Sequence, residues 1–116
     1  MKKLNIERGD VKEWLDVIRK AQQAKRKPLY ARVYELVAVP SRRRASVDLY
    51  KISRHTKEGE NVIVPGKVLG MGPMAHGISI AAISFSASAR KNLKDANCKI
   101  VSIKDMLGMS RPRIIV

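Results

Sequence analysis

A strand, a helix and a second strand, predicted in close succession in the second half of the chain, constrain the fold most. Residues 78–85 are apolar apart from small serines, a composition typical of a strand covered on both faces. Ser86 then predicts the N-cap of a helix over 87–96, which Asn97 can end in a left-handed turn. Residues 98–101 predict the next strand. Connections this short indicate a right-handed parallel crossover, and therefore an α/β fold.

Further short strands are predicted on both sides of this unit. Residues 61–64 form a β-branched run and residues 67–69 continue it, with Pro65-Gly66 between them. We interpret this Pro-Gly pair as a turn, because proline and glycine together are a strong turn signal. Residues 113–116 predict a last short strand. The sheet is therefore expected to consist of short, partly parallel strands.

The first part of the chain predicts helices. Asp10 begins a capping-box pattern, and apolar residues then recur at steps of three and four, which predicts a helix from Asp10 to about Lys25. Pro28 suits the first turn of a second helix. Val39-Pro40 ends that helix, because a residue that precedes proline is disfavoured in the helical region.

Residues 46–57 permit two predictions. Ser46 can cap a short helix that turns Val47 and Tyr50 inward and leaves the basic side chains outside. The spacing of Val47 and Leu49 also permits the alternation of a strand.

With 116 residues, of which 45% are hydrophobic, the chain is long enough for one modest core. We expect a single domain over 1–116, with a basic helical N-terminal arm in 1–57 and an α/β core in 58–116.

The charge of the chain is large and segmental. The formal net charge is +14 at pH 7, from 24 Lys and Arg against 10 Asp and Glu. Residues 1–18 are neutral, 19–57 carry +10, 58–89 carry −1 and 90–116 carry +5. Such a charge on a small protein favours a polyanionic partner, and nucleic acid is the first candidate.

Three consecutive arginines, Arg42, Arg43 and Arg44, lie in the connection that follows the second predicted helix. Adjacent guanidinium groups repel one another, and they are tolerated best where an anion neutralises them. The planar guanidinium also matches phosphate oxygens in pairs. We therefore favour contact with an anion over a merely solvated loop.

A glycine-containing loop invites comparison with phosphate-binding motifs. A Walker loop needs glycine at the position of Asn61 and Ser or Thr at the position of Val68, so that motif is absent. No dinucleotide fingerprint is present either. We interpret the loop as turn chemistry, with close approach to an RNA backbone as the alternative. Its glycines are Gly66, Gly70, Gly72 and Gly77.

Catalytic and metal-binding patterns are nearly absent from the sequence. His55 and His76 have no partner at metal-ligand spacing, and Cys98 is alone, so we expect no metal, no cofactor and no disulfide. No acid–base or nucleophile set can be argued, so we expect no enzyme.

The first ten residues lack the apolar run of a secretory signal, and no run is long enough to span a bilayer. We expect a soluble, cytosolic protein.

Three blocks of the sequence carry a resemblance to a known family. They read P-S-R-R-R-A-S-V-D-L-Y-K-I-S-R, E-G-E-N-V-I-V-P-G-K-V-L-G and A-A-I-S-F-S-A-S-A-R, in that order. Over most of its length the chain resembles the large-subunit ribosomal protein family called L-eighteen-e, which occurs in archaea and eukaryotes and is related to the bacterial protein L-fifteen. The family has long basic tails in eukaryotes, and their absence here favours an archaeal source. The segment 106–111 is shorter than the family's loop before its last strand.

The resemblance implies a domain of irregular β-β-α layers that binds large-subunit ribosomal RNA without catalysis. Its partners would be this rRNA and neighbouring ribosomal proteins, with no membrane and no small-molecule substrate, at the large subunit in the cytoplasm. A chromatin-like nucleic-acid-binding protein and an RNA-processing enzyme are the alternatives. Combining the resemblance with the basic segments, we expect the following residues to contact RNA: Lys25, Arg26, Lys27, Arg32, Arg42, Arg43, Arg44, Lys51, Arg54, Lys57, Gly66, Lys67 and Arg90.

Overall fold

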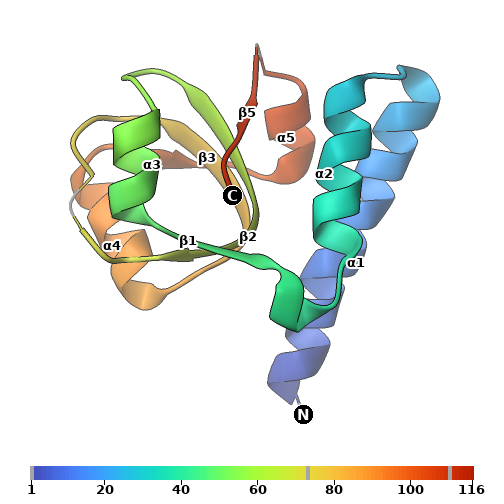
Figure 1. Ribbon diagram of the computed structural model, residues 1–116, viewed down its shortest axis with the longest axis horizontal. Helices are drawn as coiled ribbons and strands as arrows, with labels where there is room; N and C mark the ends of the chain where they lie inside the picture. The colour runs from blue at the N-terminus through green and yellow to red at the C-terminus, as the bar shows by residue number, and fades with distance from the viewer. Residues whose placement is uncertain (1, 73, 110) are drawn as a thin grey trace.

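The computed structural model describes residues 2–72, 74–109 and 111–116, without the side chains of residues 2–10 and 41. Ser110, within the short segment 106–111, is thus outside the described residues. The described elements, drawn in Figure 1, are α1 (Lys2–Ala24), α2 (Pro28–Ala38), the 3-10 helix η1 (Ser41–Arg43), β1 (Ala45–Asp48), α3 (Leu49–His55), β2 (Asn61–Leu69), β3 (Ser79–Phe85), α4 (Ala87–Asp95), β4 (Lys99–Ile100), α5 (Ile103–Leu107) and β5 (Arg113–Ile114).

The strands form one parallel sheet in the order β1-β2-β3-β4, with β5 also beside β2. β1 pairs with the second half of β2, where Ala45 lies opposite Gly66. β5 pairs with the first half of the same strand, where Arg113 lies opposite Val62. Since β3 occupies the other edge of β2, β1 and β5 follow one another along a single edge. The predicted α/β class is confirmed.

Helices cover both faces of the sheet (Figure 1). Successive apolar side chains of β2 point to opposite faces, so both faces must be covered. Ile63 points to the face covered by α1, α2 and α5, where Trp14 and Ile18 of α1 are also buried. Val62 and Val64 point to the opposite face, which α3 and α4 cover. The basic N-terminal helices therefore form a layer that packs against the sheet.

The predicted start of the first helix is wrong. α1 already begins at Lys2, so Asp10 lies inside the helix and cannot be its N-cap; the side chain of Asp10 is outside the described residues. The second helix is confirmed, because α2 starts at Pro28 and its C-cap is Val39, in an extended conformation. Local capping signals therefore located the break between the helices but not the beginning of the first one.

The predicted turn at Pro65-Gly66 is also wrong, because both residues lie inside the single strand β2. The register of β2 against β3 shifts between Val64 and Lys67. An irregularity of this kind accommodates proline, which has no N–H for the ladder. Gly66 is needed there for a different reason, since a Cβ atom on it would lie 2.0 Å from the carbonyl oxygen of Ala45.

Residues 46–57 contain both of the predicted structures in succession. The strand β1 ends at Asp48, whose carboxylate accepts a hydrogen bond from the main-chain N–H of Lys51 at 3.0 Å and so caps α3. Ser46 is therefore not the cap. Tyr50, which we expected to face inward, is 48% exposed.

The later elements agree with the sequence. The Ser86 hydroxyl accepts a hydrogen bond from the N–H of Ala89 at 3.1 Å and caps α4. Asn97 follows with a φ of 59°, the left-handed conformation predicted for it.

Among the described helices, none has both the length and the apolar character needed to cross a bilayer.

Candidate nucleic-acid interface

The turn between α1 and α2 presents the first group of predicted RNA-binding residues. Lys25, Arg26 and Lys27 are all exposed there, and the Lys27 ammonium lies 5.8 Å from the centre of the Tyr30 ring. Arg32, on α2, is exposed but lies 3.4 Å from the Glu35 carboxylate. Exposed ion pairs of this type are weak, about 0.2 to 1 kcal/mol, so Glu35 does not prevent Arg32 from meeting another anion.

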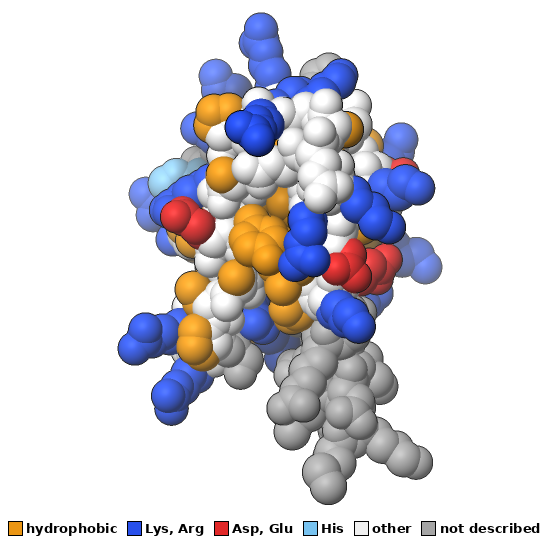
Figure 2. Space-filling view, turned by 90° about the vertical axis from the view of Figure 1, so that its right-hand side faces the viewer, with side chains coloured by type: hydrophobic (Ala, Val, Ile, Leu, Met, Phe, Trp, Pro, Cys, Tyr) orange, Lys and Arg blue, Asp and Glu red, His pale blue; other side chains and the backbone are white. Residues whose placement is uncertain are grey.

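Figure 2 shows the side of the molecule formed by α1 and α2. Lys and Arg side chains project around its margin, while hydrophobic side chains are visible in its centre. Arg19 donates a hydrogen bond to the Tyr34 hydroxyl at 3.2 Å, which raises the pKa of the guanidinium above its ordinary value. Arg19 is exposed, so its charge is presented on this face. The sequence prediction omitted it, because helical spacing does not reveal a contact between two helices.

The arginine triplet divides into two different environments. Arg42 and Arg43 are exposed in the region of η1, whereas Arg44 is partly buried. The Arg44 guanidinium donates hydrogen bonds to the carbonyl oxygens of Val37 at 3.3 Å and Val39 at 3.0 Å. Those carbonyls belong to the end of α2, where helical partners are lacking. Arg44 thus completes a helix terminus, a role that the sequence did not indicate.

A small depression brings Arg44 and Lys67 to the same place. Ser46, Gly66 and Ser84 line it as well, together with Ala45 and Ile83, around a space of about 120 Å³. Guanidinium and ammonium groups both bind phosphate oxygens well, so two cationic residues at one depression suit a phosphate group. The depression lies where β1 and β2 approach closely at Gly66, and its walls are therefore fixed by the sheet.

A third group of predicted residues surrounds α3 and α4. The Arg54 guanidinium lies 5.5 Å from the centre of the Tyr50 ring, and the Arg90 guanidinium lies 5.5 Å from the centre of the Phe85 ring. Lys51 donates a hydrogen bond to the main-chain oxygen of Val116. All three cations are exposed.

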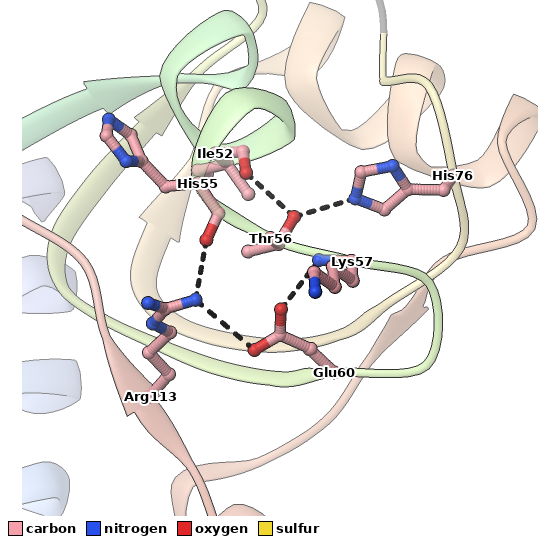
Figure 3. Close-up of polar contacts among 7 residues, drawn as sticks. All are labelled: Ile52, His55, Thr56, Lys57, Glu60, His76 and Arg113. Carbon is pink, nitrogen blue, oxygen red and sulfur yellow. Dashed lines mark hydrogen bonds and ion pairs between the residues drawn. The ribbon is translucent and has the colours of Figure 1, made fainter.

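A polar network joins α3 to β5 and the start of β2 (Figure 3). Arg113 donates a hydrogen bond to the His55 carbonyl at 2.7 Å and lies 3.5 Å from the Glu60 carboxylate. The other oxygen of Glu60 accepts from the main-chain N–H of Lys57 at 2.6 Å. The side chain of Lys57 remains exposed. The network therefore has a structural role, and the separation of its members along the chain explains why no motif revealed it.

The second histidine lies in the same region. The Thr56 hydroxyl donates to the Ile52 carbonyl at 2.8 Å and is also 2.8 Å from Nε2 of His76. Because the hydroxyl has a single proton, the ring nitrogen must act as the donor to Thr56. His76 is thus a partner of a buried threonine. Within the described part of the chain, no group of three or more His, Cys, Asp or Glu residues could hold a metal ion.

The lone cysteine, Cys98, is free and partly buried. The Cys98 thiol donates a weak hydrogen bond to the His76 carbonyl at 3.6 Å. Burial raises the pKa of the thiol, and a hydrogen bond with the backbone of Ile78 opposes this only in part. A protonated thiol is a poor nucleophile, so Cys98 has the properties of a packing residue.

The structure therefore distributes the predicted residues over separate surfaces. The basic turn at 25–27 and the triplet at 42–44 lie at opposite ends of α2 (Figure 1). Among the described side chains, only Arg32 and Arg113 form ion pairs with side-chain carboxylates. Most of the cationic charge is accordingly available to a partner that spans several faces.

Comparison with known proteins identifies the family. No protein-family model matches the chain. "Large ribosomal subunit protein eL18" from Sulfurisphaera tokodaii is 39% identical over 93 residues, which cover 80% of this chain and 75% of that protein. The proteins of the same name from Archaeoglobus fulgidus and Methanococcus maripaludis are 34% identical over 93 residues and 29% identical over 107 residues. These matches cover 80% of this chain and of the Archaeoglobus protein, and 92% of this chain and 89% of the Methanococcus protein. The chain belongs to the eL18 family of large-subunit ribosomal proteins, in its archaeal branch.

Proposed function

We propose that this chain is a structural constituent of the large ribosomal subunit that binds and stabilises folded large-subunit rRNA through Lys and Arg contacts to phosphate groups. Its family and its net charge of +14 support the proposal. The observation that carries it is local: Arg42 and Arg43 are exposed next to a depression lined by Arg44 and Lys67. This arrangement suits a bent RNA backbone that presents several phosphates.

Binding is expected to be strongly electrostatic. Each cation that neutralises a phosphate releases condensed counterions, which makes the affinity depend on salt and little on base sequence. Specificity then comes from the shape of the folded RNA, because fixed cations on several faces match only certain arrangements of phosphates. Gly66 participates through its backbone, which forms part of the depression.

The remaining predicted residues extend the contact area. We assign phosphate contacts to the turn between α1 and α2, to Arg32 on α2, and to the exposed cations of α3, of the residues just after it and of α4. The turn between α1 and α2 and the arginine triplet at 42–44 lie at opposite ends of α2, so the RNA would have to follow more than one side of the protein. The residues concerned are Lys25, Arg26, Lys27, Arg32, Lys51, Arg54, Lys57 and Arg90.

The proposed role requires no catalysis, no cofactor and no small-molecule substrate, and it places the protein in the cytoplasm beside other large-subunit proteins. It also treats residues 1–116 as one domain. The pairing of β1, from the basic half, with β2, from the second half, supports this treatment. A charged arm that folded separately would leave β2 with an unpaired edge.

Sedimentation of native cell extract through sucrose gradients at moderate and at high salt tests the function. We expect the chain to travel with the large subunit and to resist a salt wash, since stacking and 2′-hydroxyl contacts with the folded RNA do not depend on charge. RNase treatment should release it. A chain that stays at the top of the gradient, or that sediments with DNA after RNase treatment, contradicts the proposal and favours a chromatin-like role.

A further inference from the structure

Two residues with exposed side chains, Tyr50 and Met71, are neighbours at the carboxyl ends of β1 and β2. Tyr50 is 48% exposed and Met71 is 67% exposed, although large apolar side chains are usually covered. The main-chain N–H of Tyr50 donates to the carbonyl oxygen of Met71 at 2.9 Å, so the two residues are direct neighbours. A Cβ atom on Gly72 would lie 2.7 Å from Cβ of Tyr50, which shows how closely the loop follows the tyrosine.

Both residues are held by a rigid frame. Leu49 and Ile52, which lie on the same helix as Tyr50, are fully buried, and the capped start of α3 fixes the backbone of Tyr50. On the loop side, the Asn92 side chain donates to the carbonyl oxygen of Gly70 at 3.1 Å. A side chain presented in this way loses little conformational freedom when a partner covers it.

The charge around Tyr50 favours a nucleotide over an apolar protein surface. The Arg54 guanidinium lies 5.5 Å from the centre of the Tyr50 ring, and Lys51 is exposed on the same helix. The nearby Asp48 carboxylate accepts the hydrogen bond that caps α3, so it is engaged within the protein. An unpaired nucleotide offers a flat base for the ring and a phosphate for the cations, which is the usual combination in recognition of single-stranded RNA.

We propose that Tyr50, Arg54 and Met71 form a stacking platform for one unpaired base of the bound rRNA. The base lies against the tyrosine ring and the guanidinium, and the flexible thioether of Met71 fills the space at its edge. Arg54, which is exposed beside the ring, is the cation that can also meet a phosphate of the same nucleotide. The inference rests on the proposed rRNA binding, and it adds a contact that is independent of charge.

Chemical footprinting of large-subunit rRNA from the source organism tests the platform. Dimethyl sulfate and a carbodiimide together report on unpaired bases of all four kinds, with and without the purified full chain. We expect the wild-type chain to protect one or more unpaired bases. Tyr50→Ala should abolish protection at one of them and leave the other protections in place, whereas Tyr50→Phe, which keeps the ring, should preserve the whole footprint.

Binding constants measured across several salt concentrations provide a second readout. Tyr50→Ala should weaken binding roughly tenfold, with an unchanged salt slope, because a stacking contact is lost and no charge is removed. Ile100→Ala is a matched control, since Ile100 is 43% exposed on β4, away from the platform, and its loss should change neither readout. Circular dichroism checks that each variant folds, as expected for changes at exposed side chains.

Each other outcome is decisive. If Tyr50→Ala gives the wild-type footprint and an affinity within about twofold of wild type, the stacking platform is wrong and a protein neighbour becomes the better candidate for Tyr50. If Tyr50→Phe fails as Tyr50→Ala does, the hydroxyl and not the ring makes the contact. If the wild-type chain protects no rRNA base and does not bind rRNA, the proposed function itself fails.

Discussion

The Arg44 guanidinium lies 3.0 Å from the main-chain carbonyl oxygen of Val39 and donates a hydrogen bond to it. The third arginine of the triplet therefore has a structural role that the other two do not have. A second hydrogen bond, to the Val37 carbonyl, involves the same side chain. Together they close the end of α2, whose terminal carbonyls have no helical donor. The triplet therefore combines a structural residue with two exposed cations.

Replacing Arg44 by alanine should destabilise the fold. The change leaves two partly buried carbonyls without their donor, and we expect the free energy of unfolding to fall by about 1 to 2 kcal/mol. Urea denaturation followed by circular dichroism measures this value. Arg43→Ala is the matched control and should change stability by less than about 0.5 kcal/mol, because Arg43 is exposed. Equal stability of the two variants would show that the Arg44 contacts contribute little.

Replacing Arg42 and Arg43 together by alanine should weaken rRNA binding without affecting the fold. If each arginine meets a phosphate, the slope of log affinity against log salt should become shallower by about 1.5. Filter binding at several salt concentrations measures the slope. Lys99→Ala with Lys104→Ala removes the same charge from other exposed positions. If this control flattens the slope equally, total charge and not the position of the triplet governs binding.

Local signals predicted those parts of the fold that depend on neighbouring residues. The proline at position 28 and the capping serine at position 86 correctly located the starts of α2 and α4. The capping pattern at Asp10 gave a wrong start for α1, which begins at Lys2. Such a pattern also occurs inside helices, and no local signal excludes a helix that begins earlier. A sequence pattern thus identifies an element more reliably than it identifies its first residue.

Long-range contacts account for what the sequence did not predict. Pro65-Gly66 has the composition of a turn, but the strand continues because β1 pairs with it from a distant part of the chain. The partners of Arg44 are main-chain carbonyls, which have no sequence signature. The sequence therefore predicted which cationic residues belong to the candidate site. Only the structure shows which of them are exposed, as Arg42 and Arg43 are, and which are hydrogen-bonded within the protein, as Arg44 is.

Replacing Gly66 by alanine should be far more damaging than the same change at Gly59. A Cβ atom on Gly66 would lie 2.0 Å from the Ala45 carbonyl oxygen, so β1 and β2 must separate. Gly59 has a φ of 84° but open space around it, and strain alone should cost about 1 to 3 kcal/mol. Urea denaturation of both variants compares them. A Gly66→Ala chain as stable as Gly59→Ala would contradict the close approach of the strands.

Cys98 should react slowly with iodoacetamide, and its reactivity should rise at a higher pH than that of an exposed thiol. Burial raises its pKa above the ordinary value, so the folded protein holds less thiolate than the unfolded chain at the same pH. Alkylation rates between pH 7 and 10 (roughly the range over which thiols titrate), measured in buffer and in urea, test this expectation. The same shift stabilises the fold fully below the pKa of the unfolded thiol, and this stabilisation is lost as pH rises through the folded pKa. Cys98→Ser, which does not titrate in this range, should remove that part of the pH dependence of stability. An alkylation profile that is identical in buffer and in urea would show that the thiol is not shielded.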